Sequence, residues 1–283
     1  MEMFNFSTAE TKLFEKALTF VNRKEADVNA FLANTLIVKT ENFFDECDQL
    51  APYYGCLGLE DTNARLVFNP AKGGNHKILL NKTTIIGLSY IHTLVAELVH
   101  LANFVSYNAE FGNVYRFTQD QGIANYYYEF LLWTKFQAMK IGIRAHALVS
   151  WHEVNGENPP EKGCYQFAEV KFHSDRVAAC LGQLQGAEGI VVWREGFWNL
   201  LEELVFYFGR LAFYQVTPWP KELDESFPAE AIAQMIGLEN SLTFYAVLQH
   251  ATDYSQWQEQ KQNIRRAIVA MQEHGKGLFA TGA

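Results

Sequence analysis

Residues 83–107 read TTIIGLSYIHTLVAELVHLANFVSY, and the interpretation of the whole chain depends on this stretch. Its apolar residues occupy more than one face of a helix, which is typical of a helix that is buried nearly all round. Glu97 and His100 interrupt this pattern three residues apart, so they lie on the same side of the helix. A polar group in apolar surroundings costs free energy unless it is paired. These two residues are therefore the first candidates for a functional site.

The segments around this central helix predict a mainly α protein. Two short β-prone runs separated by turn-forming residues predict a small β-hairpin over about 64–81, directly before the central helix of about 83–107. A second core helix is expected over about 123–143, and a C-terminal helical part over about 164–274. No repeat or flexible linker divides the sequence. We therefore expect a multi-helix single domain over residues 1–283.

Local signals place several other helices. Ser7 and Glu10 have the spacing of a capping box and predict the start of a first helix. A weaker helical pattern covers residues 25–36. Two apolar helical patterns cover residues 189–214 and 229–250, and the second is interrupted near Gly237. The last amphipathic helix is expected over residues 255–273, where Gly275 and the glycine two positions later should end it.

Composition excludes several classes of function. The 283 residues are 49% hydrophobic and 14% aromatic, which is enough for a substantial core with many ring contacts. The net charge is −9 and no basic stripe occurs, which argues against binding to nucleic acid or an anionic membrane. No signal peptide, membrane span or CxxC pair is recognisable. We expect a soluble, intracellular protein of the cytoplasm.

Two segments of the sequence carry a family resemblance. Ala96-Glu97-Leu98-Val99-His100 matches the zinc-peptidase signature His-Glu-x-x-His except at its first position. The second core helix contains Trp133-Thr134-Lys135-Phe136-Gln137-Ala138, which looks like the segment W-S-E-F-x-A of bacterial and phage-type metallopeptidases. Over about residues 75–142 the chain therefore resembles a gluzincin-type metallopeptidase with a degenerate motif.

The resemblance implies a role for each matching position. Glu97 would stand for the catalytic general base and His100 for the second zinc ligand. Ala96 would occupy the place of the first ligand, and a methyl group cannot bind zinc. Lys135 would occupy the place of the third ligand, a glutamate. Two of the three expected metal ligands are thus replaced.

The replacements suggest that a charge has taken the place of the metal. If Lys135 pairs with Glu97, its ammonium occupies the space of the zinc ion and offsets the cost of a buried carboxylate. On this hypothesis the protein needs no cofactor and has lost peptidase activity. It would retain the cleft as a surface for a protein or peptide partner.

Other residues are associated with the same site. His92 lies on one helical stripe with His100, but eight residues rise about 12 Å, too far for both imidazoles to hold one ion; we expect it to be hydrogen-bonded at the cleft edge. Glu129 is a further carboxylate near Lys135 in sequence, although it should face another direction. Candidate cleft-lining residues are Tyr128, Trp133 and Arg210.

Two alternatives remain open at this stage. The first is an active zinc-dependent hydrolase with an unconventional third group, or one whose first ligand was replaced by design at Ala96. The second is a structural helical interaction protein with no peptidase ancestry. A di-iron bundle needs a second Glu-x-x-His, which the chain lacks. The sequence indicates neither the substrate or partner nor the oligomeric state.

Overall fold

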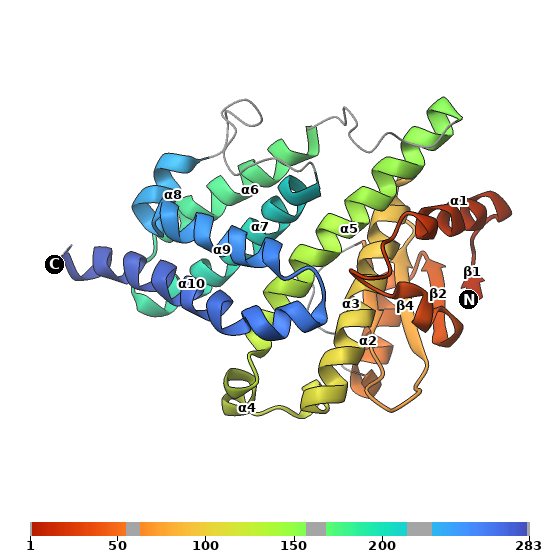
Figure 1. Ribbon diagram of the computed structural model, residues 1–283, viewed down its shortest axis with the longest axis horizontal. Coiled ribbons are helices and arrows are strands. Elements are labelled where there is room, and N and C mark those ends of the chain that lie inside the picture. The colour runs from red at the N-terminus through yellow and green to blue at the C-terminus, as the bar shows by residue number, and fades with distance from the viewer. Residues whose placement is uncertain (1, 55–62, 157–167, 214–227, 282–283) are drawn as a thin grey trace. The chain divides into compact units, whose positions relative to one another are not determined.

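A computed structural model of the chain describes residues 2–54, 63–156, 168–213 and 228–281. The protein is mainly helical, which confirms the predicted fold class (Figure 1). The chain divides into two compact units: unit 1 comprises Met1–Asn125 and Gln137–Gly163, and unit 2 comprises Tyr126–Phe136 and Cys164–Ala283. Whether the units together form the expected single domain stays a prediction.

Unit 1 contains a four-stranded sheet with the strand order β1-β2-β4-β3. β1, β2 and β4 are parallel, whereas β3 is antiparallel to β4. The predicted hairpin is therefore confirmed as β3 and β4, but it is only half of the sheet. The strands are β1 (Glu2–Phe4), β2 (Thr35–Thr40), β3 (Ala64–Val67) and β4 (His76–Asn81).

The prediction of a helix over residues 25–36 is wrong. A 3₁₀ helix, η1 (Val28–Asn34), is followed at once by β2. β2 reads TLIVKT, which is rich in β-branched residues, and it lies between β1 and β4, where Ile37 is fully buried. Pairing with strands distant in the sequence overrides the weak helical spacing here.

Helices cover both faces of the sheet. On one face, α2 (Phe43–Tyr54) packs Phe43 and Cys47 against Leu79 of β4. Neighbouring strand residues point to opposite faces, so His76 is on the other side, where Phe68 stacks on it and contacts Phe104 of α3. α1 (Thr8–Thr19), which starts with the predicted capping box at Ser7, also packs on α3.

The central helix, α3 (Ser89–Phe111), starts six residues later than predicted and ends four residues later. The reason for the late start is local. The Asn81 side chain accepts a hydrogen bond from the backbone N–H of Thr83, and Gly87 has a φ of +57°, so the segment before Ser89 forms turns. Ile86, expected on a buried face, is 83% exposed as a result.

The second core helix differs from the prediction in both its bounds. After the 3₁₀ turn η2 (Val114–Arg116), the short helix α4 (Gln119–Ala124) ends before Tyr126, whose φ is +58°. α5 (Tyr127–Asn155) then runs without interruption past the expected end at residue 143. Tyr126–Phe136 belongs to unit 2, and the rest of α5 to unit 1.

All the secondary-structure elements in the described part of unit 2 are helices. The predicted break near Gly237, which has a φ of +79°, is confirmed between α8 and α9. In the described part of the whole chain, no helix combines the length and apolar character needed to cross a membrane. The helices that follow α5 are α6 (Ala168–Gln185), α7 (Ile190–Phe213), α8 (Ala229–Met235), α9 (Leu238–His250) and α10 (Tyr254–Thr281).

α10 does not end at Gly275 as expected. This glycine is buried inside the helix, where an added Cβ would lie 2.4 Å from the Trp193 ring and 2.9 Å from the backbone oxygen of Met235. The glycine thus permits close packing of α10 on α7 and α8. Its backbone remains helical, and α10 extends to Thr281.

Candidate functional site

The degenerate motif lies in the middle of α3, in the interior of unit 1. Glu97 is 4% exposed and His100 is 6% exposed, whereas Ala96 is half-buried. The neighbouring apolar residues Leu98 and Val99 are fully buried. The interior position that the sequence predicted for this carboxylate and imidazole is therefore correct.

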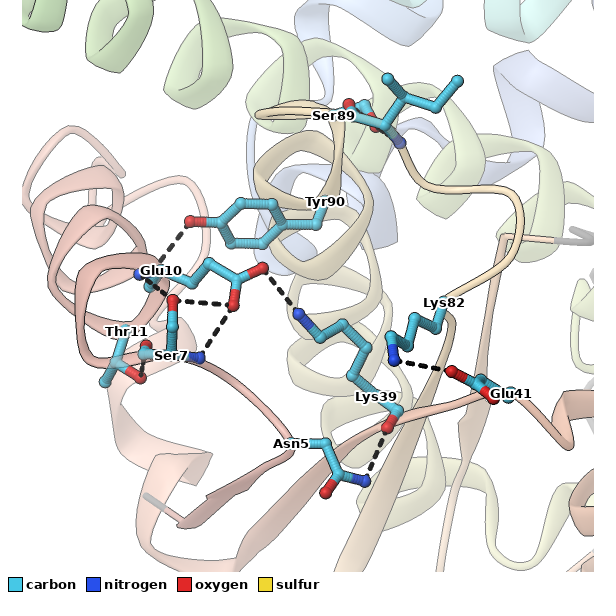
Figure 2. A network of polar contacts seen from close by, with 10 residues as sticks. Asn5, Ser7, Glu10, Thr11, Lys39, Glu41, Lys82, Ser89 and Tyr90 are labelled. Carbon is cyan, nitrogen blue, oxygen red and sulfur yellow. Dashed lines mark hydrogen bonds and ion pairs between the residues drawn. The ribbon is translucent and has the colours of Figure 1, made fainter.

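A polar network holds the start of α3 against α1 and β2 (Figure 2). The Tyr90 hydroxyl donates a hydrogen bond to the backbone oxygen of Glu10, at 2.9 Å. The Glu10 carboxylate pairs with Lys39 at 2.6 Å and accepts the backbone N–H of Ser7 at 2.8 Å. Although burial alone would raise the pKa of Glu10, the hydrogen bond from Lys39 holds it below its usual range. These contacts fix the helix that carries the motif.

Lys135 is buried in unit 2, with 5% exposure. Its ammonium lies 2.8 Å from Glu202 Oε1 and 5.9 Å from the centre of the Phe206 ring, both on α7. Lys135 thus has a carboxylate partner within its own unit. The expected partner, Glu97, belongs to unit 1, so the Lys135–Glu97 pair stays a prediction.

Glu129 pairs with a residue of α10, whereas Lys135 pairs with a residue of α7. The Arg265 guanidinium on α10 binds both carboxylate oxygens, with Nε 2.5 Å from Oε1 and Nη2 3.1 Å from Oε2. The guanidinium also lies 3.8 Å from the centre of the Tyr126 ring. The hydrogen bond to Glu129 raises the pKa of Arg265. Glu129 is therefore part of a structural ion pair.

His92 lies where α3 meets the unit 1 part of α5. A Cβ placed on Gly142 would be 2.7 Å from His92 Cδ2 and 2.8 Å from its backbone oxygen. His92 itself is half-buried. The residue thus contributes to a close helix crossing, at a site where only a glycine fits.

The three candidate cleft-lining residues have different surroundings. Trp133 is fully buried among Phe130, Tyr254 and Trp257, and its Nε1–H donates to the backbone oxygen of Ala251 at 2.7 Å. Arg210 is also buried, with 8% exposure. Only Tyr128 presents a ring to solvent, with 40% exposure.

The residues at the three expected ligand positions do not fit a zinc ion. They are a methyl group, an imidazole and an ammonium that already has a carboxylate partner. In the ranges that the structure describes, no group of three or more His, Cys, Asp or Glu side chains is placed to hold a metal. The described groups are a buried carboxylate and a buried imidazole on α3, and an ion pair between α5 and α7.

The sequence did not indicate which residues pair with Glu129 and Lys135. Glu202 was visible only as an acidic residue in the apolar helix 189–214, and Arg265 only as one charge on an amphipathic helix. One signal was present: Glu202 and Phe206 are four residues apart, so they share the face that contacts Lys135.

Comparisons with known proteins add no family to these observations. No protein-family model matches the chain, and neither a curated protein nor a solved structure matches it.

Proposed function

We propose that this chain is a metallopeptidase-like protein that has lost zinc-dependent peptidase activity and serves as a protein- or peptide-binding module. The observation that carries the proposal is the ion pair of buried Lys135 with Glu202. The resemblance places a glutamate ligand at position 135, and a cation there repels a dication. Because Glu202 neutralises this ammonium, the charge is stable without a metal.

The remaining motif residues also support loss of activity. A catalytic zinc site uses three protein ligands and one open position for water. His100 supplies one imidazole, while Ala96 supplies no donor atom. In the peptidases that the chain resembles, the glutamate at the position of Glu97 acts on a water held by the metal.

Surface aromatic residues of unit 2 support the binding role. The Tyr128 ring is 40% exposed, and its centre lies 5.7 Å from that of half-buried Trp198 on α7. Tyr and Trp are enriched at binding interfaces because they bury a large area and lose little conformational entropy. This pair offers a recognition surface without any catalytic group.

The first experiment measures metal content and cleavage on the same preparation. The purified protein is analysed by inductively coupled plasma mass spectrometry and incubated with fluorescein-labelled casein in the presence of added zinc. We expect zinc far below one ion per chain and no cleavage above that of buffer. Stoichiometric zinc that is lost in a His100→Ala variant would contradict the proposal.

A second experiment rebuilds the ordinary ligand set. The triple variant Ala96→His, Lys135→Glu, Glu202→Gln supplies the two missing ligands, and the last change removes the like charge beside position 135. We expect zinc binding by isothermal titration calorimetry in the triple variant but not in Ala96→His alone. If the folded triple variant binds no zinc, the metallopeptidase relationship is wrong. If Ala96→His alone restores activity, the replaced-ligand enzyme is the better interpretation.

A further inference from the structure

The sheet face on which α2 packs is only partly buried. Leu79 of β4 lies under α2 and is fully buried, whereas Leu36 and Val38 of β2 are half-buried. Val38 packs against the same cluster as Leu79, and Phe4 is in register with Val38, so its ring points to the same face. Phe4 lies on the edge strand β1 and is 52% exposed. The apolar face therefore opens towards β1.

An open face is unusual for parallel strands. β1, β2 and β4 are parallel, and parallel strands are normally covered by helices on both faces. A helix is about 10 Å wide and neighbouring strands are about 4.8 Å apart, so one helix covers about two strands. Because α2 packs on β3 and β4, the face over β1 and β2 has the width of one further helix.

The covered half of this face shows which kind of element it accepts. Phe43, Cys47 and Leu50 of α2 recur at the spacing of an apolar helical stripe, and they pack against the sheet or its cluster. A hollow of about 420 Å³ adjoins the open half, and Leu36 and Leu50 are among the residues that line it. An apolar side chain from a second helix beside α2 can enter this hollow.

The charges beside the open half are acidic. Glu46 of α2 is neutralised by a lysine of β4 at 3.3 Å. Asp45 and Asp48 of α2 and Glu2 of β1 are exposed, and none of the three forms an ion pair with a residue that the structure describes. Arg65 is on the same face but on β3, at the opposite edge of the sheet from β1. Basic residues are the complementary charges for a partner on this side.

We propose that the open face of β1 and β2 binds an amphipathic helix of a partner protein, whose apolar stripe is flanked by lysine or arginine residues. The stripe packs on Phe4, Leu36 and Val38, in the way that the apolar side of α2 packs on Leu79. The flanking cations lie beside the carboxylates of α2 and β1. This inference rests on the proposed binding function and specifies the chemistry of the partner.

The test measures fluorescence anisotropy of a fluorescein-labelled Leu/Lys peptide of about 18 residues, whose leucines recur at helical spacing. A scrambled peptide of the same composition has no apolar stripe, and a Leu/Glu peptide has the stripe with the opposite charge. We expect the patterned Leu/Lys peptide to bind most tightly. Its binding should slow hydrogen–deuterium exchange in β2 but not in α7.

Two variants alter the face itself. Phe4→Ser should weaken binding by about tenfold, because it removes one large apolar contact at an exposed position. The double variant Asp45→Asn, Asp48→Asn should weaken binding by about two- to fivefold at low ionic strength. Val191→Ser and Asp175→Asn remove an exposed apolar residue and an exposed carboxylate in unit 2, so neither should change the affinity.

Several outcomes would overturn the inference. They are absence of binding, equal binding of the scrambled or Leu/Glu peptide, and equal losses in the control variants. A dimer in light scattering that Phe4→Ser dissociates would also overturn it, because a second copy of the chain would then cover the face.

The metal analysis of the same preparation separates the two proposals. Protein without zinc that fails to bind the patterned peptide contradicts only the helix-binding face. Protein with stoichiometric zinc contradicts the proposed loss of the metal site, whatever the peptide result.

Discussion

At the scale of single residues, Lys135 and Glu202 form an asymmetric pair. The lysine side chain is 6% exposed, whereas the glutamate side chain is 48% exposed. Removing the glutamate leaves a charge in the interior, but removing the lysine leaves a carboxylate that water can solvate. The two substitutions should therefore have different costs.

We predict that Glu202→Gln destabilises the protein more than Lys135→Met. The first should lower the free energy of unfolding by about 1–3 kcal/mol, because the ammonium loses its charged partner. The second should cost less than about 1 kcal/mol, because methionine fills a similar volume without a charge. Urea unfolding followed by circular dichroism measures both. Equal losses would show that burial does not make the pair asymmetric.

The surroundings of the buried His76 side chain lower its pKa. Its ring stacks on Phe68, with centres 5.3 Å apart, and its Nδ1 accepts the backbone N–H of Asn69 at 3.2 Å. The accepted hydrogen bond requires an unprotonated Nδ1. Burial lowers the pKa of His76 from 6.5 to about 4.

The lowered pKa of His76 predicts a loss of stability on acidification. Between pH 6.5 and about 4 the unfolded chain binds a proton that the folded chain excludes, so the free energy of unfolding falls as the pH falls. The full effect, reached below pH 4, is on the order of 3 kcal/mol. Urea unfolding at several pH values should show a smaller decrease in His76→Gln. The same decrease in both proteins would assign the effect to other groups.

At the scale of helices, the contact between α3 and α5 depends on one glycine. Gly142 lies against both the ring and the backbone oxygen of His92. A side chain can rotate away from a new methyl group, but a backbone oxygen moves only with its helix. Gly182 in α6 provides a contrast, because a Cβ added there meets nothing within 4 Å.

We predict opposite effects for the same substitution at these two glycines. Gly142→Ala should destabilise by about 1–3 kcal/mol, because the methyl group forces α3 and α5 apart. Gly182→Ala should stabilise by about 0.5–1 kcal/mol, because alanine restricts the unfolded chain and the helix has room for it. Thermal unfolding compares the two variants. A neutral Gly142→Ala would mean that the crossing is looser than its contacts indicate.

At the scale of the whole molecule, two compact units share the continuous helix α5. The described interior of each unit contains its own buried aromatic residues: Phe68 and Phe104 in unit 1, and Trp133 and Trp257 in unit 2. Hydrophobic burial of this kind stabilises a fold without a metal. The protein should therefore not depend on zinc for its stability.

We predict that metal removal leaves the unfolding temperature unchanged. A ligand that binds the folded state raises stability in proportion to the logarithm of its concentration over its Kd, so a bound zinc would be visible. Differential scanning fluorimetry with about 1 mM EDTA, or with zinc added in excess, should show no shift. A lower midpoint in EDTA that zinc reverses would contradict the proposed loss of the metal site.

Features with local causes were the most predictable from the sequence. The capping box at Ser7, the hairpin of β3 and β4 and the helix break at Gly237 each depend on residues close together in the chain. The apolar pattern around Glu97 and His100 likewise indicated their burial. Strand β2 was missed because its partners, β1 and β4, are distant in sequence.

By itself, the sequence determined the helical class and the burial of Glu97 and His100 in the central helix. Only the tertiary structure decided that Lys135 pairs with Glu202, that Arg265 engages Glu129 and that Gly275 packs inside a helix. The physical reason is the range of the interactions. The apolar spacing and the caps of a helix depend on residues close together in the chain. An ion pair instead forms with whichever charged group the packing of distant segments brings within a few ångströms.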